Sequence, residues 1–359
     1  MSRDGLAAWY VHILVRLDAN HKIGLAHAIR VSAILDLLTV PYQVSVVGEG
    51  DLIANFFPGQ RVFRVSADNN ADFFSLIDKL QPDIILIDHP QLGSSFWRLL
   101  RGRVSCIPIV AIDDEGGEIE ADLIVNGTVL DQYHLYPLAG PQAMLMLGRE
   151  YTLIRPIFGT TPWQNPRKAS VVIVVGSGDE ASAWALQLMS GLVDLSSWGA
   201  VTMIVGRAFP DMSQLQRDCD RLGVSLATGL SGEQMASALS QASVALITGG
   251  MIVYEALAVG VPAIVFPQIE NLIPEAAWFA QRGCIVDLGY DGGMNTTLVS
   301  EEVSRLLASS SDRTAMSIIQ RATIDGHGMQ RTASEIDNLL RARASSAMRH
   351  FDKKSEPQL

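Results

Sequence analysis

The sequence predicts an α/β fold in which two domains each contain a doubly wound parallel sheet. Short apolar runs rich in β-branched residues recur along the chain, each followed by a turn and a segment with helical spacing. Two of them, Val171–Val175 and Val244–Thr248, are apolar at every position, as is typical of strands buried on both faces of a parallel sheet. The chain has 359 residues, which is long for a single core, and a Pro-rich segment at 160–169 separates two series of such units.

The expected elements follow the chain in order, with β-branched content predicting strands and apolar spacing predicting helices. The first half is expected to contain the strand Val11–Leu17, the helix Ala28–Leu38, the strand Gln43–Gly48, the helix Asp72–Leu80 and the strands Ile84–Ile87 and Ala121–Asn126. The second half is expected to contain the strand Val171–Val175, a helix from about Ala181, the strands Val201–Val205 and Val244–Thr248, a helix from Met251, the strand Ala263–Phe266 and the helices Glu301–Leu307, Arg313–Arg321 and Ser334–Arg341.

These elements predict a domain organisation with five parts. An N-terminal Rossmann-like domain covers residues 1–159 and a C-terminal Rossmann-like domain covers 170–330, with the linker 160–169 between them. A terminal helix is expected at 331–343, and the polar residues 344–359 are expected to form a flexible tail.

Composition limits the class of protein. With 48% hydrophobic and 18% charged residues, the chain can bury two cores, and no apolar run reaches the roughly 18 residues that a membrane span needs. Its net charge of −11 argues against a nucleic-acid groove, although backbone amides can still bind an anion locally. The three cysteines lie far apart without metal-ligand spacing, which fits a reducing cytoplasm. We therefore expect a cytoplasmic protein with no metal or other cofactor.

A nucleotide site is predicted in the second half. Gly249-Gly250 turns the chain from a buried strand into a helix, whose N-terminus would offer free N–H groups to a phosphate. Glu255 lies one turn into that helix, where its carboxylate could accept hydrogen bonds from a ribose. Glu270 and Asn271 follow the next strand at the same sheet edge. The alternative is an ordinary strand-turn-helix connection, which is common in α/β proteins.

A second glycine turn follows the strand Val171–Val175. Gly176-Ser-Gly178-Asp179 is a phosphate-type turn, but it lacks the full dinucleotide fingerprint. Arg207 ends the next strand and could either lie near a diphosphate or face solvent.

In the first half, the loop from Asp18 to His27 contains Gly24 and leads into a helix with Arg30 in its first turn, which suits a phosphate or sugar. His27 lies at the helix start, where the helix dipole disfavours imidazolium, so a neutral ring could accept a proton. The alternative is a capping or packing histidine.

Further polar residues end neighbouring strands. Asp88 could orient His27, bind a sugar hydroxyl or cap the next helix, and Asn126 is expected at the same crevice edge. The run 113–115 could hold a divalent ion or form a solvated loop.

An ordered series of motifs resembles a known family. Asp18, Ile23-Gly24, His27 and Arg30 are similar to the amino-terminal signature of the UDP-2,4-diacetamido-2,4,6-trideoxy-altropyranose hydrolases of pseudaminic acid synthesis and of related spore-coat polysaccharide proteins. Further stretches match in the same order: Ile84–His89, Ala111–Glu115, Ala121–Asn126, Leu147–Phe158, Gly176–Asp179 and Ile324–Arg331. The nucleotide site also resembles that of the lipid-linked N-acetylglucosamine transferase of peptidoglycan synthesis.

The resemblance implies a GT-B fold, with two Rossmann-like domains facing a central cleft and the terminal helix crossing back to the first domain. It implies a UDP-linked N-acetylated amino sugar as substrate, with Gly249-Gly250 and Gly176–Asp179 at the diphosphate and Glu255 at the ribose. His27 would be the general base for water attacking the anomeric carbon, in nonulosonic acid or surface polysaccharide biosynthesis. The resemblance does not call for a metal.

Several positions depart from the family pattern. Ala26 replaces a glycine, Pro90 replaces a tyrosine, and Leu272 and Lys22 each replace a glutamine. In the family, the positions of Pro90 and Leu272 face the sugar. Two alternatives therefore remain beside the hydrolase: a GT-B glycosyltransferase with an unknown acceptor, and a non-catalytic nucleotide-sugar binding protein.

Overall fold

The computed structural model describes residues 10–20, 25–66, 69–90, 92–176, 179–193, 195–206, 209, 212–290 and 295–355, with the main chain alone over 179–181 and 344–355. The chain divides into two compact units. The first contains Met1–Leu153 together with Met329–Leu359, and the second contains Ile154–Gly328. Each unit is an α/β structure built on one sheet.

The first unit contains a seven-stranded sheet with the order β3-β2-β1-β4-β5-β6-β7, in which every described pair of strands is parallel. Its elements are β1 (Val11–Leu17), α1 (Ala26–Leu35), β2 (Tyr42–Gly48), β3 (Arg61–Arg64), α2 (Asn70–Leu80), β4 (Ile84–Asp88), α3 (Ser94–Arg103), β5 (Ile109–Ile112), β6 (Leu123–Asn126), β7 (Met144–Leu147) and α12 (Gly328–Ser355), with short 3₁₀ helices at Ile53–Asn55, Asp131–Tyr133 and Arg149–Tyr151.

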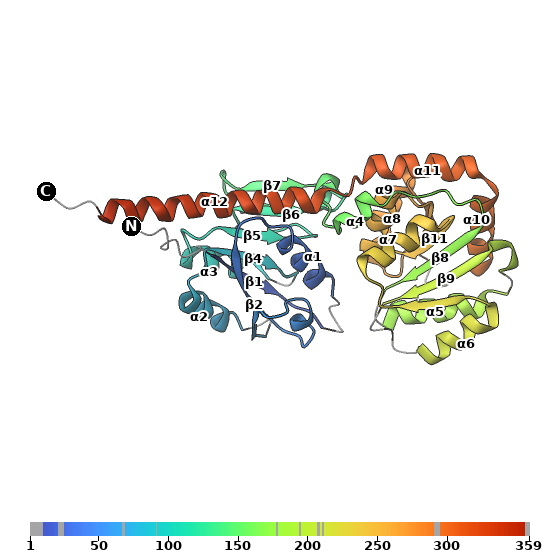
Figure 1. Ribbon diagram of the computed structural model, residues 1–359, viewed down its shortest axis with the longest axis horizontal. Helices are drawn as coiled ribbons and strands as arrows, with labels where there is room; N and C mark the ends of the chain where they lie inside the picture. Colours follow the sequence, from blue (N-terminus) through green and yellow to red (C-terminus); the bar gives the residue numbers. More distant parts are fainter. Residues whose placement is uncertain are drawn as a thin grey trace, which may run out of the picture. The chain divides into compact units, whose positions relative to one another are not determined.

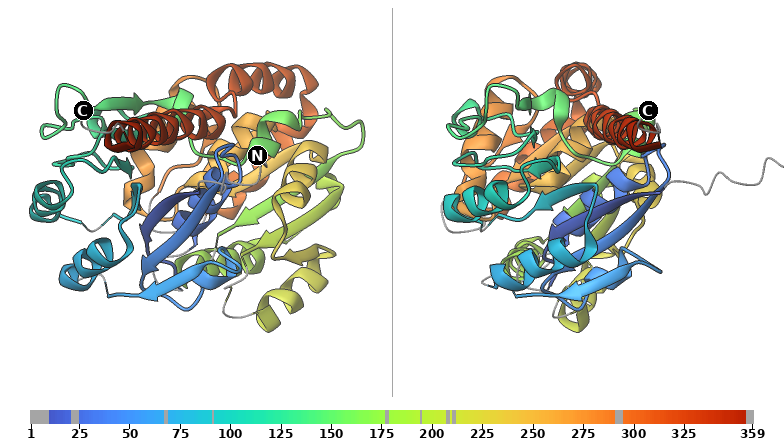
Figure 2. Two further views of the ribbon diagram at one scale, coloured as in Figure 1. Left: turned by 60° about the vertical axis from the view of Figure 1, so that its left-hand side comes forward. Right: turned by 90° about the vertical axis from the view of Figure 1, so that its left-hand side faces the viewer.

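Helices cover both faces of this sheet (Figures 1 and 2). On one face, α1 and α12 pack with alternate residues of β1, because successive side chains of a strand point to opposite faces. On the other face, α2 and α3 contribute Phe73, Phe96 and Trp97 to a second core. The strands between the two cores are buried on both sides, which explains the apolar runs of β4 and β5.

The helix α12 belongs to the first unit although it follows the second in sequence. Its residues Met329, Ala333, Ile336 and Leu340 lie in the core with β1 and α1. Asp337 accepts hydrogen bonds from the N–H groups that follow α1, at 3.0 Å from Thr39 N and 3.3 Å from Val40 N. The helix continues to Ser355, through the segment 344–355 where the sequence suggested a tail.

The second unit contains a six-stranded sheet with the order β10-β9-β8-β11-β12-β13, again parallel throughout the described strands. Its elements are α4 (Pro156–Thr160), β8 (Ser170–Val175), α5 (Asp179–Gly191), β9 (Ala200–Val205), α6 (Met212–Leu222), β10 (Ser225–Thr228), α7 (Gly232–Gln241), β11 (Val244–Thr248), α8 (Met251–Val259), β12 (Ala263–Phe266), α9 (Ile273–Gln281), β13 (Val286–Asp287), α10 (Thr296–Ala308) and α11 (Ser310–Thr323), with 3₁₀ helices at Ser196–Trp198 and Glu270–Leu272.

The sheet of the second unit is also covered on both faces. The helices α5, α6 and α10 pack with alternate residues of β8 in one core, while α4, α7, α8 and α11 pack against one another. Figure 1 shows α5 and α6 on the opposite side of β8 and β9 from α7 and α8.

The boundary between the units lies after Leu153, earlier than the expected end of the first domain at 159. The reason is that α4 packs on α7 and α8, with the side chain of Phe158 fully buried. The segment 161–169 has no regular helix or strand, but Trp163 binds the second unit through N–H donation to Val259 O at 2.9 Å and Nε1 donation to Ala242 O at 2.7 Å.

The expected buried strands are present, and β5 ends within the stretch Ala111–Glu115 that matches the family. The other strands without an expected counterpart are β3, β7, β10 and β13. All four lie at a sheet edge, where a strand has one partner and keeps half-exposed, polar or mixed residues. Within the described part of the chain, no helix combines the length and the apolar character that crossing a bilayer would require.

Candidate active site

Strand pairing in the first unit brings distant polar residues to one sheet edge. Leu17 of β1 lies beside Asp88 of β4, and Asp88 lies beside Ile112 of β5. The residues that end or follow these strands therefore meet at their carboxyl ends, where open α/β sheets bind ligands. The helix α1 starts next to them at Ala26, so His27 lies in its first turn.

His27 and Asp88 form a hydrogen-bonded pair, as one of the three alternatives for Asp88 predicted. His27 Nδ1 lies 2.7 Å from Asp88 Oδ1; the Asp88 carboxylate is buried and the imidazole is 14% exposed. An ionised carboxylate can only accept hydrogen bonds, so Nδ1 carries the proton in this pair. Nε2 of the neutral ring is then an acceptor, as a general base requires.

Arg30 is buried and bound to carboxylates rather than presented to a ligand. Its Nε and Nη2 donate to the two oxygens of Asp88 at 2.6 Å each, and Nη1 donates to Asp114 at 2.8 and 3.0 Å. Burial raises the pKa of Asp88, but the charge and hydrogen bonds of Arg30, and then those of His27, outweigh burial and hold this pKa well below its usual range. Arg30 thus keeps the partner of His27 ionised; sequence reasoning instead assigned it to the substrate.

Asp18 and His89 form a second buried pair at this edge. His89 Nε2 lies 3.0 Å from Asp18 Oδ2, while Asp18 Oδ1 accepts the N–H of Glu49 at 2.7 Å. Although burial acts in the opposite direction, these hydrogen bonds lower the pKa of Asp18. Through these two contacts, Asp18 connects the ends of β1, β2 and β4. Its expected contact with the substrate remains a prediction.

Asn126 is fully buried and organises the connection that follows β6. Its Nδ2 donates to Tyr133 O at 3.0 Å and to the Tyr136 hydroxyl at 2.8 Å, and its Oδ1 accepts the N–H of Thr128. Tyr136 in turn donates to Asp113 at 2.7 Å. With its amide used in this way, Asn126 supports the loop rather than pointing at a ligand.

The acidic run 113–115 has partners inside the first unit. Burial raises the pKa of Asp113, which accepts hydrogen bonds from Tyr136 and two backbone N–H groups, and Asp114 binds Arg30. Among the described residues, no group of three or more His, Cys, Asp or Glu side chains has the arrangement of a metal site.

The two glycines of the turn in the second unit are constrained in different ways. Gly250 has φ 89° and ψ −157°, a conformation open essentially to glycine, and it is the residue from which α8 starts. A Cβ on Gly249 would lie 2.7 Å from Leu272 Cδ1. Leu272, one of the departures from the family pattern, therefore packs directly on this turn. The first N–H groups of α8 have no side-chain cap.

Glu255 binds Arg155, a residue that sequence reasoning missed. Arg155 Nη2 lies 3.3 Å from Glu255 Oε1, and the buried Arg155 Nε has no hydrogen-bond partner among the described residues. Burial raises the pKa of Glu255 to about 7, although Arg155 lowers it. Arg155 lies in the stretch Leu147–Phe158 that matches the family, but it is 100 positions from Glu255, so no local pattern predicts that the two residues pair.

The remaining expected site residues divide into two groups. Gly176, Glu270 and Asn271 are exposed at the carboxyl ends of β8 and β12. Gly24, Gly178 and Arg207 lie outside the described residues, as does the side chain of Asp179. Ala26 keeps a negative φ, since the non-glycine residues described with positive φ are Gln81 and Asn165, so its replacement of glycine causes no backbone strain.

Comparison with known proteins places these features in context. No protein-family model matches the chain. The spore coat polysaccharide biosynthesis protein SpsG of Bacillus subtilis (strain 168) is 20% identical over 337 residues, which cover 92% of this chain and 98% of SpsG. The resemblance to the spore-coat type is thereby confirmed, as that of a divergent relative.

Solved structures show the same fold. MurG of Acinetobacter baumannii has a TM-score of 0.60 at 14% identity, and the match covers 91% of this chain and 99% of the MurG chain. The calicheamicin glycosyltransferase CalG4 has a TM-score of 0.60 at 16% identity, and the match covers 93% of this chain and 99% of the CalG4 chain. UDP-GlcNAc 2-epimerase of Neisseria meningitidis, bound to UDP-GlcNAc, has a TM-score of 0.58 at 12% identity, and the match covers 92% of this chain and 100% of the epimerase chain. The predicted GT-B class, with two Rossmann-like parallel-sheet units, is confirmed.

Proposed function

We propose that this protein hydrolyses a UDP-linked N-acetylated amino sugar, releasing UDP and the free sugar. His27 takes a proton on Nε2 from a water molecule as the water oxygen bonds to the anomeric carbon. The bond from that carbon to the phosphate oxygen breaks, and its electrons leave with UDP. The observation that carries the proposal is the His27–Asp88 pair, whose hydrogen bond directs the ring proton to Nδ1 and leaves Nε2 as the base.

The ionised Asp88 supports this chemistry in two ways. It fixes the tautomer and orientation of the His27 ring, and its charge stabilises the imidazolium that forms when the base accepts its proton. A base positioned in this way contributes typically about 10²–10⁴-fold to the rate. UDP is a good leaving group, so the protein need not protonate it strongly.

The second unit supplies the nucleotide site in this proposal. The N–H groups at the start of α8, with Gly249-Gly250 and Gly176, suit the diphosphate, and Glu255 suits the ribose hydroxyls. Glu270 and Asn271 are exposed at the same sheet edge and are assigned to the sugar. The epimerase bound to UDP-GlcNAc supports a UDP-sugar ligand, and SpsG supports a role in polysaccharide biosynthesis.

A glycosyltransferase is the second candidate, favoured by the fold shared with CalG4. In that case His27 would take its proton from an acceptor hydroxyl instead of water. A protein that binds nucleotide sugars without turnover is the third candidate, favoured by Pro90 and Leu272 at sugar-facing positions.

The test is UDP release from a panel of UDP-linked N-acetylated amino sugars with water as the sole acceptor. We expect His27→Ala to abolish release while UDP affinity stays within about twofold, because the base does not hold the nucleotide. His134→Ala is a matched control, since the His134 ring is also 14% exposed in the first unit. UDP binding without release from any sugar would favour a transferase or a binding protein, and absence of UDP binding would refute the nucleotide site.

A further inference from the structure

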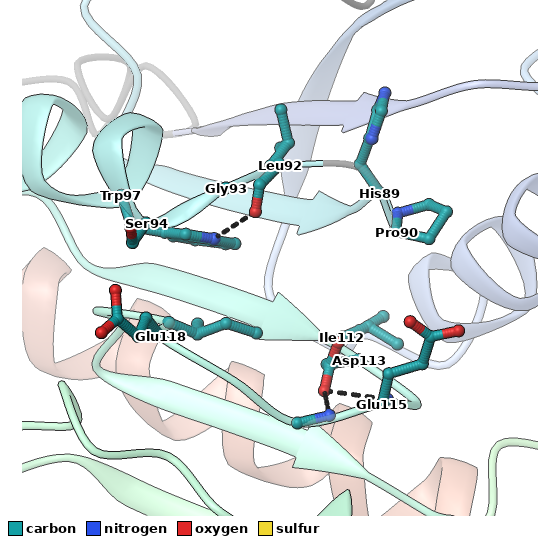
Figure 3. Close-up of a pocket in the computed structure, with 12 residues that line it drawn as sticks. His89, Pro90, Leu92, Gly93, Ser94, Trp97, Ile112, Asp113, Glu115 and Glu118 are labelled. Atoms are coloured by element: carbon teal, nitrogen blue, oxygen red, sulfur yellow. Dashed lines mark hydrogen bonds between the residues drawn. The ribbon is translucent and has the colours of Figure 1, made fainter.

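A pocket of about 120 Å³ opens at the carboxyl edge of the first sheet, between β4 and β5. One wall is the connection from β4 into α3, and the other is the connection that follows β5 (Figure 3). The residues that line it are His89, Pro90, Leu92, Gly93, Ser94, Trp97, Ile112, Asp113, Glu115, Gly116, Glu118 and Ile119.

This pocket adjoins the His27 site through the chain itself. Asp88, which binds His27, directly precedes His89, and Asp114, which binds Arg30, directly follows Asp113. Pockets for whole small-molecule ligands usually measure about 300–1,000 Å³. A volume of about 120 Å³ is therefore too small for a nucleotide sugar but suits one substituent of a sugar held at His27.

The lining combines three kinds of group. Trp97, Ile112 and Ile119 are buried and apolar, and the Trp97 N–H is already donated to Leu92 O at 3.2 Å. The first N–H groups of α3 are donors at Ser94, because a helix leaves its first N–H groups without intrahelical partners and Gly93 offers no side-chain cap. The facing connection contributes the carboxylates of Glu115 and Glu118 (Figure 3). Glu118 Oε2 also lies 3.4 Å from Arg98 Nη2, which leaves its other oxygen as an acceptor.

We propose that this pocket binds the N-acyl group of the amino sugar, which extends the proposed function to a specificity site. The acyl methyl packs on the apolar residues, the acyl oxygen accepts from the N–H groups of α3, and the amide N–H donates to Glu115 or Glu118. Three carboxylates line the pocket and disfavour an anion. A free amine would satisfy the carboxylates but would place a cation against the positive end of α3.

The experiment uses the full chain with ¹³C-labelled isoleucine methyl groups, because Ile112 and Ile119 line the pocket. The probes are the methyl glycosides of N-acetylglucosamine, glucosamine and glucose, which carry no nucleotide. We expect the methyl signals of Ile112 and Ile119 to shift with the N-acetylated glycoside and not with the other two. No shift, or an equal response to all three glycosides, would overturn the proposal. A stronger response to the glucosamine glycoside would also overturn it, because the pocket would then bind an amine and not an acyl group.

Two variants make the assignment specific. Ser94→Leu places a larger side chain in the pocket and should weaken binding of the N-acetylated probe at least about tenfold. Ser95→Leu is the matched control, because Ser95 is exposed on the same helix turn and does not line the pocket. Equal losses in both variants would contradict the assignment.

A separate titration with UDP distinguishes this inference from the proposed function. Ile252 lies in the first turn of α8, so its methyl signal reports on the nucleotide site of the second unit. A response of Ile252 to UDP without a response of Ile112 and Ile119 to the N-acetylated probe would refute the pocket alone. The converse result would refute the nucleotide site alone.

Discussion

At the scale of single residues, the first unit shows that one carboxylate can have several partners. Asp88 accepts from His27 and Arg30 while fully buried, and its charge is compensated by the guanidinium. The sequence suggested Asp88 as a possible partner of His27 but assigned Arg30 to the substrate. The correct partners depend on side-chain directions that a motif does not specify.

Asp88→Asn should reduce turnover by about 10²–10⁴-fold. A carboxylate only accepts hydrogen bonds and so fixes the proton on Nδ1 of His27, whereas an asparagine amide can also donate and carries no charge to stabilise the imidazolium. UDP affinity should stay unchanged. Steady-state kinetics and UDP titration measure the two effects, with Asp131→Asn as a control at an exposed carboxylate of the same unit. A folded Asp88→Asn protein with wild-type turnover would remove Asp88 from the mechanism.

Glu255→Gln should change how stability depends on pH. The pKa of Glu255 is raised from 4.5 to about 7 in the folded protein, so the folded state binds more protons than the unfolded chain between these values. Its contribution therefore favours folding below about pH 4.5 and is lost as pH rises through about 7. Relative to Glu255→Gln, the wild type should lose on the order of 1–3 kcal/mol of unfolding free energy between about pH 5 and pH 8.

Urea unfolding of both proteins at the two pH values measures this difference. An equal change in the two proteins would mean that Glu255 is ionised throughout, as in a strong ion pair with Arg155. Arg155→Ala provides the converse control, since loss of the cation should enlarge the pH dependence.

At the scale of elements, the turn into α8 combines two demands on the backbone. Gly250 needs a positive φ, and a Cβ on Gly249 would push against the side chain of Leu272. The Gly-Gly sequence predicted the turn, while the packing of Leu272 depends on a loop more than twenty residues later. The edge strands β3 and β7 likewise depend on their neighbours, since each has a partner on one side.

Gly250→Ala should destabilise the second unit by about 1–3 kcal/mol, because alanine is strained at this φ and ψ. It should also weaken UDP binding, as the N–H groups of α8 lose their position. Gly102→Ala is the contrasting control: Gly102 is exposed within α3, with open space where a Cβ would lie, and its replacement should stabilise the helix by about 1 kcal/mol. Thermal unfolding measures both; a loss of similar size in the two variants would argue against a special role for Gly250.

At the scale of the whole molecule, the chain forms the first unit from two separate segments. Met329, Ala333, Ile336 and Leu340 complete its core, and Asp337 binds the backbone that follows α1. The second unit, from Ile154 to Gly328, is continuous in sequence. The two units should therefore respond differently to truncation at the C-terminus.

Truncation after Gly328 should destabilise the first unit and leave the second folded, because it exposes the apolar core under α12. Hydrogen exchange should show lost protection in β1 and β4 with retained protection in β8 and β11, and UDP binding should persist. Truncation after Arg343 keeps the core residues of α12 and should preserve protection in both units. Equal loss of protection in both units after the first truncation would contradict this division.

The sequence by itself determined the buried strands, the Gly249-Gly250 turn that follows β11 and the position of His27 at a helix start. These features are local, because apolar runs, positive φ and helix entry depend on neighbouring residues. Only the tertiary structure decided that Arg30 binds Asp88 and Asp114, that Asp18 binds His89 and that Glu255 binds Arg155. Those contacts join residues 58 to 100 positions apart, and their geometry follows from strand order and side-chain packing, which no local pattern specifies.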